Sequence, residues 1–225
     1  MTRVNIFCEG QTEEAFVREL LTPHFASMNI WITYIIVRTS RAGKGGIPSY
    51  GKIKNQVKKK CKEDKNSWVT TLFDFYAFPW RDISPPIDTK GDSFSRAGSI
   101  ETAFKDDINQ PNFIPNLVVH ELEGLLFSNP SAFNDWFNVE AGMELTAIRN
   151  DFATPEHINN SSKTAPSKRI LALCPGYEKA WHGPLIAVEI GLDTIRRECP
   201  RFDGWIKRLE ALAKNTTPPP GNSPR

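Results

Sequence analysis

The sequence predicts an α/β protein, a layered sheet of about four mostly parallel strands followed by a helical C-terminal extension. Two observations support this fold class. Up to about residue 130, apolar segments rich in β-branched and aromatic residues alternate with helix-patterned segments. Beyond that point the strand signals stop, and only short helical patterns follow. An alternating order of strands and helices is typical of parallel sheets, because each parallel strand needs a crossover connection.

The first half of the alternation begins at the N-terminus. A buried strand is predicted over residues 4–10, and Thr12 is a plausible N-cap of the helix after it. A second strand is predicted over 30–37, and a glycine-rich loop over 41–51. The next helix is surrounded by lysines, and its apolar stripe consists of Ile53, Val57 and Cys61.

The second half repeats this pattern. A third strand is predicted over 67–79, and a helix follows on which Ile100 and Phe104 share one face. A fourth strand is predicted over 113–121, continuing as a short helix that stops near Pro130.

The 225 residues suffice for one large domain with a buried core. We expect an α/β domain over 1–130, a helical extension over 131–214 packed on the same core, and a disordered proline-rich tail over 215–225. The net charge of +2 gives no global sign of a nucleic-acid partner. The sequence shows neither a membrane-spanning run nor a signal peptide, and its widely spaced cysteines predict reduced thiols. A cytoplasmic location and no membrane partner are therefore expected.

Acidic residues follow three of the four predicted strands. Glu9 ends the first strand, Asp74 lies near the end of the third, and Glu121 and Glu123 follow the fourth. Ligands of parallel α/β sheets bind beyond the carboxyl ends of the strands, where such acids converge and repel one another unless a cation or proton balances them. Oxygen ligands suit Mg²⁺ or Mn²⁺. The alternative for each acid is that it caps a helix.

The residues quoted so far resemble the Toprim domain, the metal-binding fold of topoisomerases, primases and OLD-family nucleases. CEGQTEE resembles the first Toprim motif in its OLD-like form, and TTLFDFYAFP resembles the second, Asp-x-Asp motif. The stretches FDFYAFP, HELEGLLF, PSKRI and CPRFDGWIKRL resemble small uncharacterised bacterial Toprim-like proteins. Such proteins are encoded beside ABC- or AAA-type ATPases in RloB- and AbiL-like phage-defence loci.

The resemblance implies roles for individual residues. Glu9 would be the general acid/base or a metal ligand, and Asp74 the principal metal ligand. Glu13, one helical turn beyond Glu9, is a further candidate ligand. Tyr76 stands where the motif has its second Asp, so either one metal binds or one of the two glutamates after the fourth strand replaces the missing acid.

Basic residues are the candidates for binding a phosphate backbone. Lys58 and Lys59 lie on the lysine-rich helix, where a solvated face is the alternative, and Lys44 lies in the glycine-rich loop. Lys168, Arg169 and Lys179 belong to stretches that resemble the family, and we expect them to neutralise or hold a phosphate. The alternative for the first two is that they are exposed positions of a helix capped by Ser167.

His120 precedes the HELEG acids, and three roles are open to it. It could orient a carboxylate, donate to phosphate or act as an acid near neutral pH, and a purely structural histidine is equally compatible.

Two main hypotheses for the function follow. The first is a Mg²⁺- or Mn²⁺-dependent phosphodiesterase, a nuclease on DNA or RNA, in which Glu9, Lys168 and His120 are catalytic. It would be the effector of an ATPase-coupled anti-phage defence system, with a possible homo-oligomeric state. The second is a catalytically degenerate Toprim module that binds an ATPase or nucleic acid and regulates it. A weaker third is phosphoryl or nucleotidyl transfer to a small molecule.

Overall fold

The computed structural model describes residues 1–38, 47–87, 90–158 and 164–214. It confirms the predicted fold class, because a parallel sheet in the order β2-β1-β3-β4 lies at the centre, with β5 also paired to β3. The strands are β1 (Thr2–Cys8), β2 (Ile30–Ile36), β3 (Ser67–Asp74), β4 (Phe113–Ile114) and β5 (Leu117–Val118).

Helices connect the strands. The connections up to β4 contain α1 (Gln11–Phe16), the π-helical turn η1 (Val17–Leu21), α2 (Thr22–Ser27), α3 (Tyr50–Glu63), η2 (Trp80–Asp82) and α4 (Ser93–Ile108). The elements after β5 are η3 (Leu122–Ser128), η4 (Pro130–Phe133), α5 (Val139–Asn150), η5 (Pro155–His157), α6 (Pro166–Leu173), α7 (Lys179–Ile190), α8 (Leu192–Glu198), α9 (Pro200–Glu210) and η6 (Ala211–Lys214).

Two predicted strands needed correction. The third ends at Asp74, not at residue 79, because the chain turns there and the Phe78 N–H donates to the Asp74 carbonyl. The fourth is split into two short strands on either side of Pro115, which has no N–H to donate to a neighbouring strand. The helix expected after it is the 3-10 helix η3.

The two faces of the sheet are covered by different helices. Alternate residues of β1 point to opposite faces, so Ile6 packs against helices of the N- and C-terminal regions, whereas Phe7 packs against α3 and α4. The first of these two cores joins residues from Val4 to Leu212. The Trp205 indole of α9 fixes the packing by donating to Thr70 Oγ1 of β3 at 3.0 Å.

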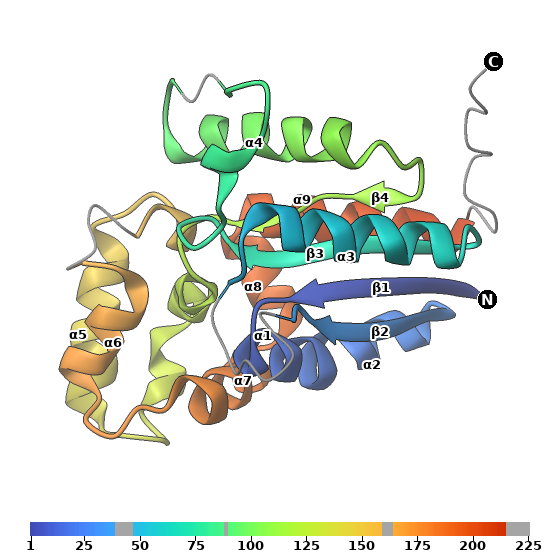
Figure 1. Ribbon diagram of the computed structural model, residues 1–225. Helices are drawn as coiled ribbons and strands as arrows, with labels where there is room; N and C mark the ends of the chain where they lie inside the picture. The colour runs from blue at the N-terminus through green and yellow to red at the C-terminus, as the bar shows by residue number, and fades with distance from the viewer. Residues whose placement is uncertain (39–46, 88–89, 159–163, 215–225) are drawn as a thin grey trace, which may run out of the picture.

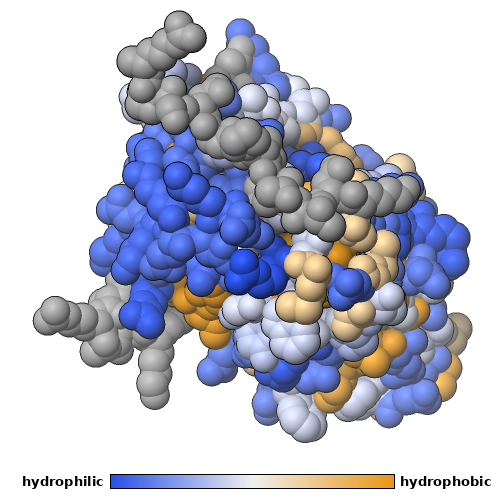
Figure 2. Space-filling view, turned by 90° about the vertical axis from the view of Figure 1, so that its right-hand side faces the viewer, coloured by the Kyte–Doolittle hydropathy of each residue, from blue (hydrophilic) through white to orange (hydrophobic). Residues whose placement is uncertain are grey.

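The strands all run in one direction, with their carboxyl ends toward the region of α5, α6 and α7 (Figure 1). The opposite end of the molecule, where the strands begin, presents a largely hydrophilic surface with small hydrophobic areas between (Figure 2). No helix in the described ranges is long and apolar enough to cross a membrane.

Candidate functional site

The register of the sheet brings the predicted acids to one level. Cys8 of β1 pairs with Leu72 of β3, so Glu9 and Asp74 leave the sheet within one residue of the same level. Asp74 in turn pairs with Val118 of β5, three residues before Glu121. The sequence placed these acids at the carboxyl ends of the strands, and the parallel register brings those ends together.

Glu9 is partly buried directly after β1. Its Oε2 is fully enclosed and has no hydrogen-bond partner among the described residues. Burial raises the pKa of Glu9 to about 7, and the negative charges of Glu13 and Glu123 act in the same direction. A hydrogen bond from the Asp74 backbone and the charge of Lys179 oppose this rise of the pKa. The carboxyl group is therefore held where ionisation is costly.

Glu13 is buried and caps its own helix. Its Oε2 accepts a hydrogen bond from the Gly10 N–H at 2.8 Å, which makes Gly10 the N-cap of α1 and corrects the expectation that Thr12 has this role. Burial raises the pKa of Glu13, as does the charge of Glu123. One carboxylate oxygen of Glu13 is thus already used inside the protein.

Asp74 ties the end of β3 to the next segment. Its Oδ1 accepts a hydrogen bond from the Leu122 N–H at 3.0 Å, so it also holds the start of η3. Burial raises the pKa of Asp74 well above its ordinary value, and the charges of Glu13, Glu123 and Glu9 add to the effect. We call the four side chains that act on one another in this way the carboxylate cluster: Glu9, Glu13, Asp74 and Glu123.

Glu123 and Lys179 form an ion pair at the edge of the cluster. Glu123 is 2% exposed, and the Lys179 ammonium lies 2.9 Å from its Oε1. Burial raises the pKa of Glu123 even though Lys179 opposes this. Burial acts to lower the pKa of Lys179, but the charges of Glu123, Glu121 and Asp74 together raise it. Lys179 therefore lies at the acids and is a cation under ordinary conditions.

Glu121 has a different task from Glu123, and the sequence left open which of the two enters the site. The Oε2 of Glu121 accepts a hydrogen bond from the Ser167 N–H at 3.0 Å, in the first turn of α6. Ser167 is buried inside that turn and is not the N-cap, which is Ala165. Glu121 therefore caps a helix, as the alternative reading of the acids allowed, and Glu123 belongs to the carboxylate cluster.

The two basic residues of PSKRI are placed differently. Lys168 is exposed on α6. Arg169 donates from Nε to the Thr164 carbonyl at 2.8 Å, and its guanidinium lies 5.5 Å from the centre of the Phe152 ring. These contacts give Arg169 a structural task. The catalytic role expected of Lys168 and the binding of nucleic acid by Arg169 stay predictions.

His120 is a buried residue with an unusual backbone. It is 4% exposed, has φ of 71°, and stacks on the ring of Tyr76 at 5.3 Å between centroids. Burial lowers the pKa of His120 to about 4, and His157 and Arg96 act in the same direction. Its imidazole is thus neutral at pH 7, which does not suit the role of a general acid near neutral pH. Orienting a carboxylate or donating to phosphate remain predictions.

Tyr76, which stands where the Toprim motif has its second Asp, is 55% exposed beside this histidine. It contributes an aromatic ring and no carboxylate to the site.

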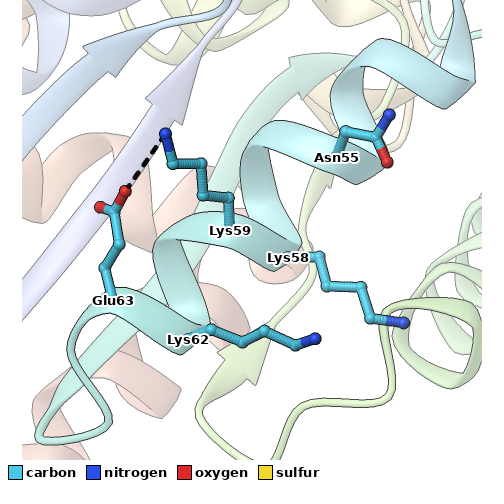
Figure 3. A pocket seen from close by; sticks show the side chains of 5 residues that line it. All are labelled: Asn55, Lys58, Lys59, Lys62 and Glu63. Carbon is cyan, nitrogen blue, oxygen red and sulfur yellow. Dashed lines mark ion pairs between the residues drawn. The ribbon is translucent and has the colours of Figure 1, made fainter.

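The remaining lysines lie elsewhere. Lys58 and Lys59 line a shallow hollow of about 480 Å³ near the C-terminal end of α3, with Asn55, Lys62 and Glu63 (Figure 3). Lys59 is directed toward Glu63 at 3.7 Å, and Lys58 and Lys62 extend to the other side. Because α3 ends shortly before β3 begins, the hollow lies at the opposite end of the sheet from the carboxylate cluster. Lys44 falls outside the described residues.

The cluster leaves polar atoms without partners. Within the described ranges, no three His, Cys, Asp or Glu side chains stand close enough together to hold a metal ion as they are.

The structure adds one residue that the sequence did not indicate: Tyr177, whose buried hydroxyl has no hydrogen-bond partner in the described part of the chain. No pattern in the sequence singles it out, since burial and a missing partner are properties of the folded chain. The four cysteines are free and buried.

Comparisons with known proteins place the chain in a family. The family described as "Domain of unknown function (DUF4276)" matches residues 8–210. No curated protein matches the chain. One similar solved structure is the C-terminal region of the OLD protein of Xanthomonas campestris pv. campestris, with 16% identity over 96% of this chain and 99% of that one. The TM-score of that match is 0.36.

Proposed function

The chain belongs to the DUF4276 family, and we propose that it is a Mg²⁺- or Mn²⁺-dependent phosphodiesterase acting on DNA or RNA. The observation that carries this proposal is the carboxylate cluster, four acids at or just beyond the carboxyl ends of parallel strands, with Lys179 ion-paired to Glu123. Four ionised carboxylates and one ammonium have a net charge of about −3, which needs either protons or a metal cation to balance it in a buried place.

The donor set fits a hard divalent cation, because every side chain of the cluster offers oxygen. Asp74 and Glu123 would hold the ion together with water molecules, because no three acidic side chains of the described residues stand close enough to do so as they are. Glu13, Glu121 and Asp74 each have one oxygen bound to a backbone N–H, which leaves one oxygen of each for a ligand. A bound divalent cation would supply Lewis acidity toward a phosphoryl oxygen.

Other side chains would bind the substrate phosphate, accept a proton and line the site. Lys179 carries positive charge beside the acids and would bind the phosphate of the substrate. Glu9, with its free Oε2, is the side chain that would take a proton from the attacking water. The neutral imidazole of His120 would serve as a fixed wall of the site beside Tyr76.

The proposal is tested by cleavage of plasmid DNA and tRNA with purified protein in Mg²⁺, Mn²⁺ or EDTA. Glu9→Gln and Asp74→Asn should abolish cleavage. Glu14→Gln is the matched control, because Glu14 is on the same helix as Glu13 but pairs with Arg18 at 2.6 Å on the surface. Cleavage by Glu9→Gln and Asp74→Asn at the wild-type rate would contradict the mechanism.

The motifs that resemble Toprim-like defence proteins support a finer proposal. We propose that the chain is the effector of an anti-phage system whose other component is an ABC- or AAA-type ATPase encoded beside it. Cleavage should then increase when the purified ATPase and ATP are added, and should not change with an ATPase variant that cannot hydrolyse ATP. Equal cleavage with the active ATPase and with this variant would mean that the chain is a nuclease that does not depend on ATP hydrolysis by this partner.

A second candidate function is a catalytically degenerate module that binds an ATPase or nucleic acid. Two observations favour it: Tyr76 in the position of a carboxylate, and the separation of the acidic side chains within the described residues. Calorimetry with Mn²⁺ separates the two candidates. Binding that is lost in Asp74→Asn favours the enzyme, and no heat of binding at millimolar Mn²⁺ favours the degenerate module.

A further inference from the structure

Tyr177 lies in the turn between α6 and α7 and is 5% exposed. Its hydroxyl has no hydrogen-bond partner in the described part of the chain. A buried hydroxyl without a partner costs folding free energy, because it has lost its hydrogen bonds to water. Such a group in a native protein calls for an explanation, among which are a bound ion and a catalytic role.

The ring of Tyr177 is fixed from several sides. It lies 6.4 Å from Phe133, 6.3 Å from Phe137 and 5.9 Å from His182, measured between ring centroids. The hydroxyl is therefore held in place by packing and not by a hydrogen bond. The hydroxyl oxygen is enclosed, so a ligand reaches it only when neighbouring side chains move apart.

The hydroxyl lies close to α1, the helix that carries Glu13. A Cβ atom placed on Gly183 of α7 would lie 3.1 Å from Tyr177 Oη and 3.8 Å from Thr12 Cγ2 of α1, so the hydroxyl is at the contact of these two helices. Burial raises the pKa of Tyr177, and the charges of Glu123 and Glu121 raise it further. The group is therefore a protonated donor that donates to no residue of the described chain.

A second donor stands two residues away. Lys179 is the first residue of α7, and its ammonium lies 2.9 Å from Glu123 Oε1, an oxygen that no hydrogen bond of good geometry reaches within the described chain. The start of a helix favours anions, because its first N–H groups are unpaired and the helix dipole is positive there. The donors are therefore on the α7 side, and the acids are at the ends of the strands.

We propose that the Tyr177 hydroxyl and the Lys179 ammonium form an oxyanion-binding pair that holds a phosphoryl oxygen beside the carboxylate cluster. This rests on the proposed phosphodiesterase function and adds to it the group that recognises the substrate phosphate. Tyr177 binds and positions the phosphate, and it takes no part in proton transfer. Gly183 lies beside this pair, and its lack of a side chain leaves room for the Tyr177 hydroxyl.

The test compares two buried tyrosines. Tyr50 is 4% exposed and its hydroxyl donates to Asp107 Oδ2, so Tyr50→Phe removes a satisfied hydrogen bond. Tyr177→Phe removes a hydroxyl that makes no hydrogen bond within the described chain. Thermal unfolding in EDTA should show a fall in Tm of about 2–4 °C for Tyr50→Phe, and no fall for Tyr177→Phe.

Binding of inorganic phosphate is then measured by calorimetry, with Mg²⁺ and with EDTA. Tyr177→Phe should weaken phosphate binding about tenfold or more, because a hydrogen bond to a charged group is lost, and should leave Mg²⁺ affinity unchanged. Tyr50→Phe should bind phosphate like the wild type. Gly183→Ala should also weaken binding by displacing the hydroxyl, and should have no further effect in the Tyr177→Phe background.

Each outcome decides the question. Wild-type phosphate affinity in Tyr177→Phe, or a fall in its Tm equal to that of Tyr50→Phe, would overturn the pair and leave the proposed phosphodiesterase standing. Absence of phosphate binding to the wild type in both buffers would also overturn it. Phosphate binding in EDTA that depends on Tyr177 would support the pair, and would count against the metal dependence of the proposed function.

Discussion

Glu9 shows at the scale of one residue how a candidate functional site costs stability. Its carboxyl group is enclosed beside three other acids, and its Oε2 lacks a hydrogen-bond partner among the described residues. The folded protein holds the pKa at about 7, whereas the ordinary value is 4.5. Between these two pH values the unfolded chain releases the proton and the folded chain keeps it. Stability from this group is therefore complete below pH 4.5 and is lost as the pH rises to about 7.

Glu9→Gln should therefore stabilise the protein at high pH. Glutamine cannot ionise, so the variant should gain up to roughly 3 kcal/mol in the free energy of unfolding at pH 8 and little at pH 5. Urea unfolding in EDTA at the two pH values measures this gain. Glu14→Gln, which alters a surface ion pair with Arg18, should show no such dependence on pH. A gain for Glu9→Gln that is equal at both pH values would show that the charge of Glu9 is not the cause.

At the scale of elements, long-range caps fix the C-terminal helices to the rest of the chain. Glu156 of η5 is 4% exposed, and its two oxygens accept from the N–H groups of Arg201 and Phe202 at 2.9 and 3.0 Å. These N–H groups begin α9, which packs on the sheet through Trp205. A side chain 45 positions away thus caps the helix that covers one face of the sheet.

Glu156→Ala should destabilise the protein by about 2–4 kcal/mol, because it leaves two N–H groups at the helix start without their acceptor. Glu156→Gln keeps one amide oxygen as an acceptor and should lose less. Urea unfolding gives both values, with the exposed Glu144→Ala of α5 as the control. If Glu156→Ala were as stable as that control, the cap would have no energetic role.

The difference between local patterns and long-range contacts explains which elements the sequence could predict. The stripe Ile53, Val57 and Cys61 is buried as expected, because helix periodicity is a local property. The roles of Glu121 and Glu123 could not be predicted, since one of them depends on Ser167 in a helix 46 positions away. The convergence of the acids was predictable from the order of strands and helices, whereas their caps and ion pairs depend on packing.

At the scale of the whole molecule, the helices after residue 130 complete a core that begins in the sheet. Val4, Ile6 and Leu72 pack in one cluster with residues as far along the chain as Leu212. The candidate site depends on this arrangement, because Tyr177 and Lys179 come from the C-terminal region, whereas Glu9 follows β1 and Asp74 ends β3. A sheet whose face is left uncovered exposes its apolar residues to water, which removes the main favourable term in folding.

A chain cut after residue 130 should therefore fail to fold, although it contains every strand. It retains α3 and α4 on one face of the sheet but loses α7, α8 and α9 from the other. We expect fragment 1–130 to show no cooperative thermal transition by circular dichroism and poor dispersion of its amide signals by NMR. Fragment 1–214 is the matched control, and it should unfold at the Tm of the full chain because it keeps the whole of this core. A cooperative transition in fragment 1–130 would mean that the α/β region is an independent domain, and that the cluster acids reach their positions without the helices that carry Lys179 and Tyr177.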